Sequence, residues 1–144
     1  MKLTTKGRYG LRLMLDLAMH EGSGPILLKD IADRQNLSEK YLWSLIAPLK
    51  SAGYVRSLRG AKGGYMLAKH ADEITLKDIV TTLEGSLCLV DCVCDANFCN
   101  RRDNCISHCV WRDISAKMTS IFENITLTSM LDNYSQKEGH DDDF

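Results

Sequence analysis

The residues with the most distinctive chemistry are the six cysteines, which all lie between positions 88 and 109. Secreted disulfide frameworks and cytosolic metal or redox sites both gather cysteines in this way. The chain has no run of about 18 apolar residues. Its first residues also lack the apolar core and small-residue cleavage site of a secretory signal. We therefore expect a cytoplasmic protein without a membrane span, and in that compartment a metal or redox site is favoured.

A candidate ligand set lies in the second half of this segment. Five residues separate Cys99 from Cys105, two separate Cys105 from His108, and Cys92 and Cys94 come before them. Three thiolates and one imidazole suit either a tetrahedral zinc ion or a [2Fe–2S] cluster. Zinc sites commonly use cysteines about two to four residues apart. The longer spacer between Cys99 and Cys105 therefore favours the cluster.

The two outer cysteines, Cys88 and Cys109, fall at the ends of expected helices. A free cysteine often behaves as a small buried apolar side chain. We therefore expect both to be buried, and we leave them out of the ligand set.

Apolar spacing in the first half of the chain predicts three helices, over residues 6–20, 29–35 and 39–51. The last two are separated by a tight turn, and Ser38 is the expected N-cap of the third helix. Pro48 is expected to distort the last turn of that helix. Two short β-type runs, 54–58 and 65–67, flank a basic, glycine-rich turn. A helix-turn-helix followed by such a hairpin indicates a winged helix.

The second half predicts the elements that position the cysteines. A helix capped by Thr75 ends at Glu84, and a longer helix over 109–124 carries an apolar stripe from Ile114 to Ile125. This stripe could form a dimer seam or pack within one chain. The expected fold is mainly α. It comprises a winged helix-turn-helix domain with a two-stranded β wing (1–84), a cysteine-rich cluster loop (85–108), a C-terminal dimerisation helix region (109–134) and a disordered acidic tail (135–144).

The charge distribution is strongly uneven between the two halves. Residues 1–70 carry twelve basic and five acidic side chains, a balance of +7, whereas residues 71–144 carry six and fourteen, a balance of −8. A basic half attached to a helix-turn-helix and a wing predicts binding to double-stranded DNA. No acid–base pair or nucleophile stands out beyond the cysteines, so we do not expect an enzyme.

Several side chains are candidates for contacts with DNA. If the apolar positions of the third helix are buried, its outer face is free to enter the major groove. The N-terminus of that helix could seat a phosphate, and an arginine in the wing could enter the minor groove. The candidate DNA-binding residues are Ser38, Lys40, Tyr41, Trp43, Ser44, Arg59 and Lys62.

These residues together resemble the Rrf-two family of winged-helix regulators over roughly residues 1–132. The resemblance rests on the opening MKLTTKGRY, the wing sequence RGAKGGY at 59–65, Cys99/Cys105/His108, and the WRD and NITL sequences at 111–113 and 124–127. The cysteine–histidine triplet is similar to that of the IscR type, whose members hold a [2Fe–2S] cluster by three cysteines and a histidine. The resemblance implies a homodimer that binds operator DNA, controls iron–sulfur assembly genes and receives its cluster from donor proteins.

The sequence departs from the family pattern at the first ligand. The family has five residues between its first two cysteines, whereas six residues lie between Cys92 and Cys99 and four lie between Cys94 and Cys99. Alignment from the N-terminal side favours Cys92, with Cys94 as the alternative. The metal ligands expected from the resemblance are therefore Cys92, Cys99, Cys105 and His108.

Three other functions remain open from the sequence. The protein could be a nitric oxide or redox sensor of the same family, or a DNA-binding regulator with a structural zinc site. It could also be a small ferredoxin-like electron carrier, although that would leave the basic half and the wing unexplained.

Overall fold

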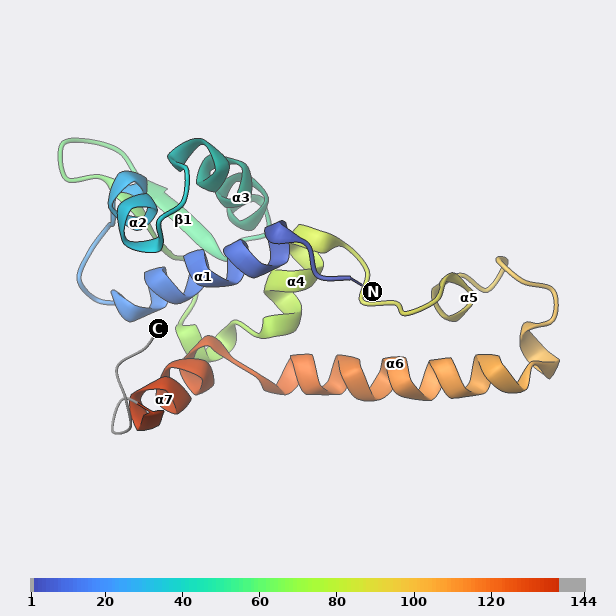
Figure 1. Ribbon diagram of the computed structural model, residues 1–144. Helices are drawn as coiled ribbons and strands as arrows, with labels where there is room; N and C mark the ends of the chain where they lie inside the picture. The colour runs from blue at the N-terminus through green and yellow to red at the C-terminus, as the bar shows by residue number, and fades with distance from the viewer. Residues whose placement is uncertain (1, 138–144) are drawn as a thin grey trace.

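The computed structural model describes residues 2–137, in which helices predominate and a single two-stranded sheet occurs. Figure 1 shows helices α1–α4 packed together with the hairpin β1–β2, and we call this part the head. Helices α5 and α6 extend from it, and we call them the arm. The expectation of a mainly α, winged helix-turn-helix fold is confirmed. The helices are α1 (Thr5–Met19), α2 (Leu28–Gln35), α3 (Glu39–Ser51), α4 (Leu76–Glu84), α5 (Asp91–Cys94), α6 (Ile106–Asn124) and α7 (Leu127–Lys137), and the strands are β1 (Val55–Leu58) and β2 (Gly64–Leu67).

The turn of the helix-turn-helix is built by two residues. Asn36 ends α2 in the left-handed conformation with φ 52°, which asparagine tolerates better than most residues. The Ser38 hydroxyl then accepts a hydrogen bond of 3.0 Å from the backbone N–H of Tyr41 and caps α3, as predicted. Pro48 lies inside α3, which nevertheless continues to Ser51.

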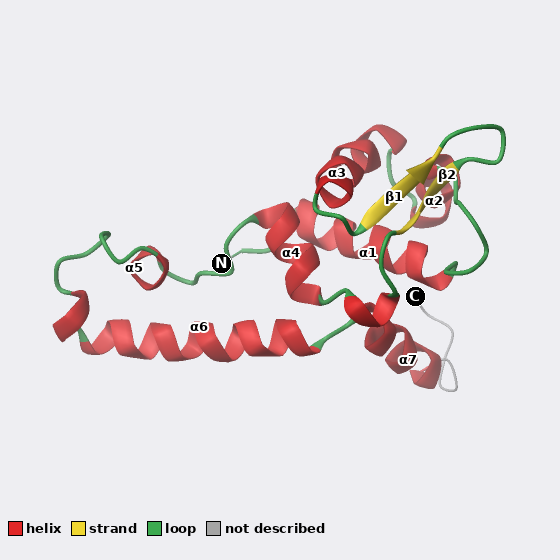
Figure 2. Ribbon diagram, turned by 180° about the vertical axis from the view of Figure 1, so that it is seen from behind, coloured by secondary structure: helices red, strands yellow, loops and turns green. Residues whose placement is uncertain are grey.

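The wing is the antiparallel pair β1–β2, in which Val55 faces Leu67 and Leu58 faces Gly64. Figure 2 shows the two strands beside α2 and α3. Ile26 extends the pair, because its backbone exchanges two hydrogen bonds of 2.8 Å with Tyr65. At Gly64 a Cβ would lie 2.5 Å from the carbonyl oxygen of Ile26, and φ is +152°. Glycine therefore allows the chain before α2 to approach the wing.

One apolar core joins the helices of the head and the wing. The apolar positions of α3 are fully buried, and α1, α2, β1, β2, α4 and α7 contribute further buried side chains. The core residues include Leu13, Met14, Leu17, Ile31, Leu42, Leu45, Ile46, Leu49, Val55, Leu67, Ile74, Ile79 and Leu127. Burial of this kind, at about 25 cal/mol per Å² of apolar surface, is the main force that holds the head together.

The base of the arm is tied to the start of α4. Thr75 caps α4 in a reciprocal pair with Asp78, as its position predicted. The backbone N–H of Leu76 donates to Ile125 over 2.7 Å, and that of Leu127 donates to Ile74 over 3.0 Å. The junction of α6 and α7 is therefore fixed to the head.

The second half differs from the predicted boundaries. The long helix begins at Ile106 rather than 109, and the segment expected to be a loop contains α5 and a 3-10 turn at Arg102–Asn104. The separate helix α7 was not predicted, because a short interruption at residues 125–126 breaks the apolar period. It includes residues 135–137, which were expected to be disordered; the rest of that predicted tail, 138–144, lies outside the described residues.

The arm leaves apolar side chains uncovered. We call Ile106, Val110, Ile114 and Ile121 the α6 stripe; their exposed fractions are 85%, 49%, 43% and 58%. The expectation that Cys109 is buried is wrong, because it also lies on an open face of α6.

Within residues 2–137, no helix is long and apolar enough to cross a membrane.

Helices α1 and α4 approach closely at Gly10. A Cβ built on Gly10 would lie 2.0 Å from Cδ1 of Leu83, far inside van der Waals contact. Because Leu83 is itself packed against the core, it has limited freedom to withdraw.

We expect Gly10→Ala to destabilise the protein, because overpacking of about 1–3 kcal/mol outweighs the gain in helix propensity of about 0.5–1 kcal/mol. Chemical denaturation measures the change. Leu83→Ala provides the matched background, since it removes the methyl group that the new Cβ meets. In that background Gly10→Ala should be neutral or stabilising; equal destabilisation in both backgrounds would contradict the steric account.

Candidate nucleic-acid interface and cysteine segment

The outer face of α3 is open to solvent. Its apolar residues point into the core, which leaves the polar and aromatic ones outside. Trp43 is 54% exposed. The exposed candidates on this helix and its cap are Ser38, Lys40, Trp43 and Ser44. The Ser44 hydroxyl donates to the carbonyl oxygen of Tyr41 over 2.5 Å, so it is oriented by its own helix.

Tyr41 is the candidate on α3 that faces inward. It is half-buried, its hydroxyl donates to Oγ1 of Thr5 over 3.1 Å, and its ring meets Tyr9 edge-to-face at 5.9 Å. Edge-to-face aromatic pairs contribute about 0.5–1.5 kcal/mol beyond burial. Tyr41 therefore fixes α3 on α1.

The wing is held against α3 by a second aromatic pair. The rings of Trp43 and Tyr65 meet edge-to-face with centroids 5.9 Å apart. At the tip of the hairpin, Arg59 and Lys62 are both exposed, and Gly60 adopts φ +113° to form the turn. We call Lys40, Trp43, Ser44, Arg59 and Lys62 the α3–wing surface.

One basic residue beside this surface was missed by the sequence analysis. Arg8 is exposed on α1, and its guanidinium lies 5.7 Å from the ring centroid of Tyr9, which in turn packs on Tyr41. It therefore stands next to the start of α3. The available signal was the cluster of basic residues in the first ten positions, which the helix-turn-helix pattern does not include.

A buried carboxylate sets the position of α2 on α1. Asp16 is 2% exposed, and its oxygens accept hydrogen bonds from Nη2 of Arg34 at 2.6 Å, from Nε of Arg34 at 3.1 Å and from Nε2 of Gln35 at 2.9 Å. The hydrogen bond with Asp16 raises the pKa of Arg34. A buried charge must be satisfied in this way to be tolerated.

The cysteine segment, residues 85–105, joins α4 to α6 and lies away from the α3–wing surface (Figure 1). Cys105 occupies the N-cap position of α6, and its sulfur lies 3.1 Å from the Ser107 hydroxyl. A hydrogen bond from that hydroxyl, followed by one from the backbone N–H of His108, lowers the pKa of Cys105. The thiolate, which is the form that binds metals, is therefore favoured here.

His108 lies on the first turn of α6 and is only 6% exposed. Its Nε2 accepts a hydrogen bond of 3.2 Å from Nε of Arg102. His108 is therefore not a surface residue. The ring nitrogen that faces the cysteine segment is thus held by an arginine of that segment.

The remaining cysteines fall into two groups. Cys92 and Cys99 are half-buried free thiols. Cys88 and Cys94 are paired as a disulfide, with their Cα atoms 6.2 Å apart. Cys88 is therefore not the inert buried residue that was expected. Within residues 2–137, no three His, Cys, Asp or Glu side chains are gathered closely enough to hold a metal ion.

Comparison with known proteins assigns the chain to a family. Residues 3–133 match the Rrf2 family, described as iron-dependent transcriptional regulators. The chain belongs to the Rrf2 family. The family resemblance inferred from the sequence is confirmed, and this Rrf2 protein is an IscR-like transcription regulator, not an enzyme.

Individual relatives of this Rrf2 regulator support the assignment. The IscR transcriptional regulator of Pectobacterium atrosepticum is 40% identical over 133 residues, which are 92% of this chain and 80% of that protein. The structure of T. potens IscR has a TM-score of 0.76 and 40% identity, covering 100% of this chain and 94% of the other. CymR of B. subtilis, described as a global cysteine regulator, has a TM-score of 0.76 and 39% identity, covering 90% and 95%. Since both regulators fit the fold equally well, the cofactor must be argued from the cysteine segment.

One side chain connects the cysteine segment of this Rrf2 regulator to its head. Glu84, the last residue of α4, accepts hydrogen bonds at Oε1 from the N–H and hydroxyl of Thr4, both at 2.7 Å, and from the N–H of Gly7 at 2.9 Å. It therefore caps α1 from outside. A Cβ on Gly7 would lie 2.8 Å from the same oxygen, so glycine is needed there.

We expect Glu84→Gln to change how stability depends on pH. The Thr4 hydroxyl, followed by the N–H groups of Gly7 and Thr4, lowers the pKa of Glu84 from its ordinary 4.5. A carboxylate with a lowered pKa stabilises the fold above its ordinary pKa, and that contribution is lost as pH falls through the lowered value. The variant should be less stable at pH 7 and should lose less stability on acidification.

Thermal unfolding between pH 7 and pH 3 measures this difference. Asp72→Asn removes an exposed carboxylate of the same head, and its curve should run parallel to that of the wild type. If the unfolding temperature of Glu84→Gln also changed with pH in parallel with that of the wild type, the charged cap would be ruled out.

Proposed function

We propose that this Rrf2 regulator is a cytoplasmic homodimer that binds a double-stranded DNA operator and controls iron–sulfur assembly genes according to a bound [2Fe–2S] cluster. The observation that carries the proposal is the pairing of two features in one chain. An exposed, basic α3–wing surface occupies the head, and a cysteine-rich segment that ends beside the buried His108 joins that head to the arm.

The α3–wing surface supplies the contacts with DNA. A helix of this exposure enters the major groove, where Lys40 and Ser44 reach base edges or phosphates. Trp43 offers an apolar face to a thymine methyl or a sugar, and Ser38 with the N-terminus of α3 seats a phosphate. Arg59 enters the minor groove and Lys62 neutralises a phosphate. Tyr41, half-buried against α1, contributes chiefly by positioning α3.

The α6 stripe supplies the dimer contact. Exposed apolar residues recur along one face of a 19-residue helix, which is about 28 Å long at 1.5 Å per residue. A second copy of the same helix covers such a stripe symmetrically. A dimer presents two α3 helices to half-sites one helical turn apart, about 34–36 Å.

The ligands proposed for the cluster are Cys92, Cys99, Cys105 and His108, and their donor chemistry fits it. Thiolates and imidazole are the ligands of such clusters. Cys105 lies at the N-cap of α6, and His108 on the first turn presents a ring nitrogen toward the segment. The involvement of Cys94 with Cys88 favours Cys92 over Cys94. When bound, the cluster supplies a redox-active centre whose presence reports the availability of iron and sulfide. Cluster donor proteins are the implied partners.

Ordering of the cysteine segment is the proposed link to DNA. Arg102 would release His108, and the segment would settle against α4 and α6. Glu84, at the end of α4, holds α1, whose Thr5 and Tyr9 hold Tyr41 of α3. A cofactor that favours one arrangement of this chain of contacts shifts the population of DNA-binding states.

The cluster is tested by Cys99→Ala. Anaerobically purified wild-type protein should be coloured and contain about two irons with acid-labile sulfide per chain, and Cys99→Ala should lose both. Cys109→Ala is the matched control, because Cys109 is exposed on α6 and is not a proposed ligand. One zinc per chain would instead identify a structural metal site, and iron retained in Cys99→Ala would overturn the ligand assignment.

The DNA contacts are tested by Arg59→Ala and Lys62→Ala. Loss of Arg59 should weaken operator binding by roughly 5- to 150-fold, as expected for about 1–3 kcal/mol. Loss of Lys62 should weaken binding to all sequences and reduce the salt slope by about one per chain. Lys137→Ala, which removes an exposed charge at the end of α7, should leave both unchanged. Fluorescence anisotropy at several salt concentrations measures these values, and an unaltered affinity in both wing variants would contradict the role of the wing.

A further inference from the structure

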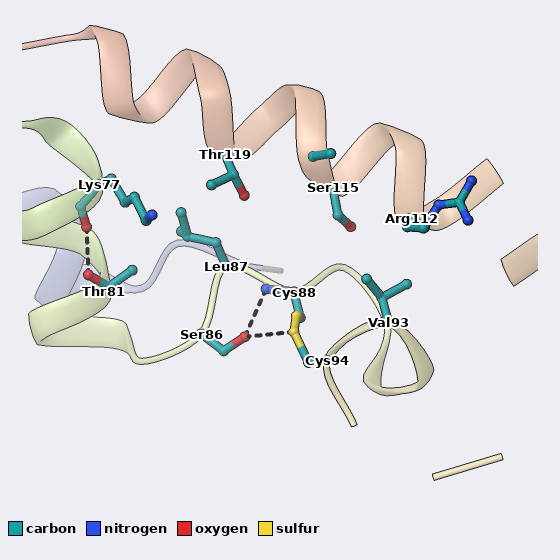
Figure 3. A pocket seen from close by; sticks show the side chains of 11 residues that line it. Lys77, Thr81, Ser86, Leu87, Cys88, Val93, Cys94, Arg112, Ser115 and Thr119 are labelled. Atoms are coloured by element: carbon teal, nitrogen blue, oxygen red, sulfur yellow. Dashed lines mark hydrogen bonds between the residues drawn. A yellow bond between two sulfur atoms is a disulfide. The ribbon is translucent and has the colours of Figure 1, made fainter. Parts of the chain in front are cut away.

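Cys88 and Cys94 form a thiol pair outside the proposed ligand set. Their sulfurs are in bonding contact, and the Cα separation of 6.2 Å lies within the range that disulfides span. The other four cysteines are free. Figure 3 shows the two sulfurs side by side next to Ser86, on a loop that faces α6.

The Cys88 side of the pair is anchored. The N–H of Gly85 donates to the carbonyl of Thr81 over 3.1 Å at the end of α4, and Leu87 is buried to 7% exposure. The N–H of Cys88 donates to the Ser86 hydroxyl oxygen over 3.0 Å. These contacts hold Cys88 at a fixed distance from the head.

The Cys94 side is accessible. Cys94 is exposed at the end of the single-turn α5, and its sulfur lies 3.5 Å from the Ser86 hydroxyl. Both cysteines line an open cavity of about 510 Å³, together with Val93 and, on α6, Arg112 and Ser115. A small oxidant or a small thiol can therefore reach the sulfurs.

We propose that Cys88 and Cys94 are a second redox site, a dithiol that closes reversibly to a disulfide. A hydroperoxide is the oxidant. One thiolate attacks its outer oxygen, which gives a sulfenic acid and releases water or an alcohol. The second thiol attacks the sulfenic sulfur, the S–S bond forms and a water leaves, so the pair loses two electrons and two protons in total. A small thiol reverses the reaction by exchange.

The closed pair would select the first ligand of the cluster. Cys92 lies inside the ring that the disulfide closes, and Cys94 is one of its two ends. Oxidation removes Cys94 as a donor and leaves Cys92, whereas reduction makes both available. This consequence rests on the proposed cluster; the disulfide itself does not.

Mass spectrometry of the full chain tests the redox site without a cluster. Iron-free, reduced protein treated anaerobically with one equivalent of hydrogen peroxide should lose two hydrogen atoms in mass, and its free thiols should fall from six to four. Treatment with a small thiol should restore both values. Absence of the mass loss would overturn the proposal, even if the purified protein binds iron.

Matched variants identify the two cysteines. A protease that cleaves before aspartate places the cysteines in separate peptides. Cys88 lies in peptide 78–90, Cys92 and Cys94 lie in peptide 91–94, and Cys99 lies in the peptide that begins at Asp95. The cross-link between the first two peptides should persist in Cys92→Ser and disappear in Cys94→Ser and Cys88→Ser. A cross-link that persists in Cys94→Ser, or that joins Cys99 or Cys105, would contradict the assignment. Cys88→Ser should keep the iron content of the wild type, so failure of the cluster proposal and failure of this one are distinguishable.

Discussion

The arrangement of the molecule depends on the close contact between α1 and α4. Glu84 reaches the N-terminus of α1 and receives three hydrogen bonds there, and only glycine at positions 7 and 10 leaves room for this approach. Because Glu84 immediately precedes the cysteine segment, the same contact joins the cysteines to the head. Thr4 and Gly7 therefore position the cysteine segment, through Glu84, as well as the start of α1.

A second constraint acts within the head. The buried carboxylate of Asp16 is satisfied by Arg34 and Gln35 on α2, and Arg12 also donates to Gln35 from α1. Since a turn of three residues, 36–38, connects α2 to α3, this polar network also fixes the orientation of α3. Apolar packing alone would allow the helices to slide; directional hydrogen bonds to a buried charge do not.

Local signals in the sequence were sufficient for the head. The Ser38 and Thr75 caps, the glycine-rich wing and the apolar positions of α3 each act within a few residues, and the structure has them as predicted. The tertiary contacts of single side chains could not be predicted from the sequence in this way. Pro48 lies inside α3, which continues to Ser51 with Leu45 and Leu49 buried. Tyr41 faces inward, with its hydroxyl on Thr5 and its ring on Tyr9. The pairing of Cys88 with Cys94 could not be read from spacing, since six cysteines allow many pairings.

The two tryptophans of the chain stand in different places. Trp43 lies on α3 against the wing residue Tyr65, and Trp111 lies on α6, three residues after His108. Both are partly exposed, at 54% and 42%. Tryptophan fluorescence can therefore distinguish changes around α3 from changes near the start of α6. A variant that keeps only Trp43 would report on the approach of nucleic acid, and one that keeps only Trp111 would report on the proposed cluster.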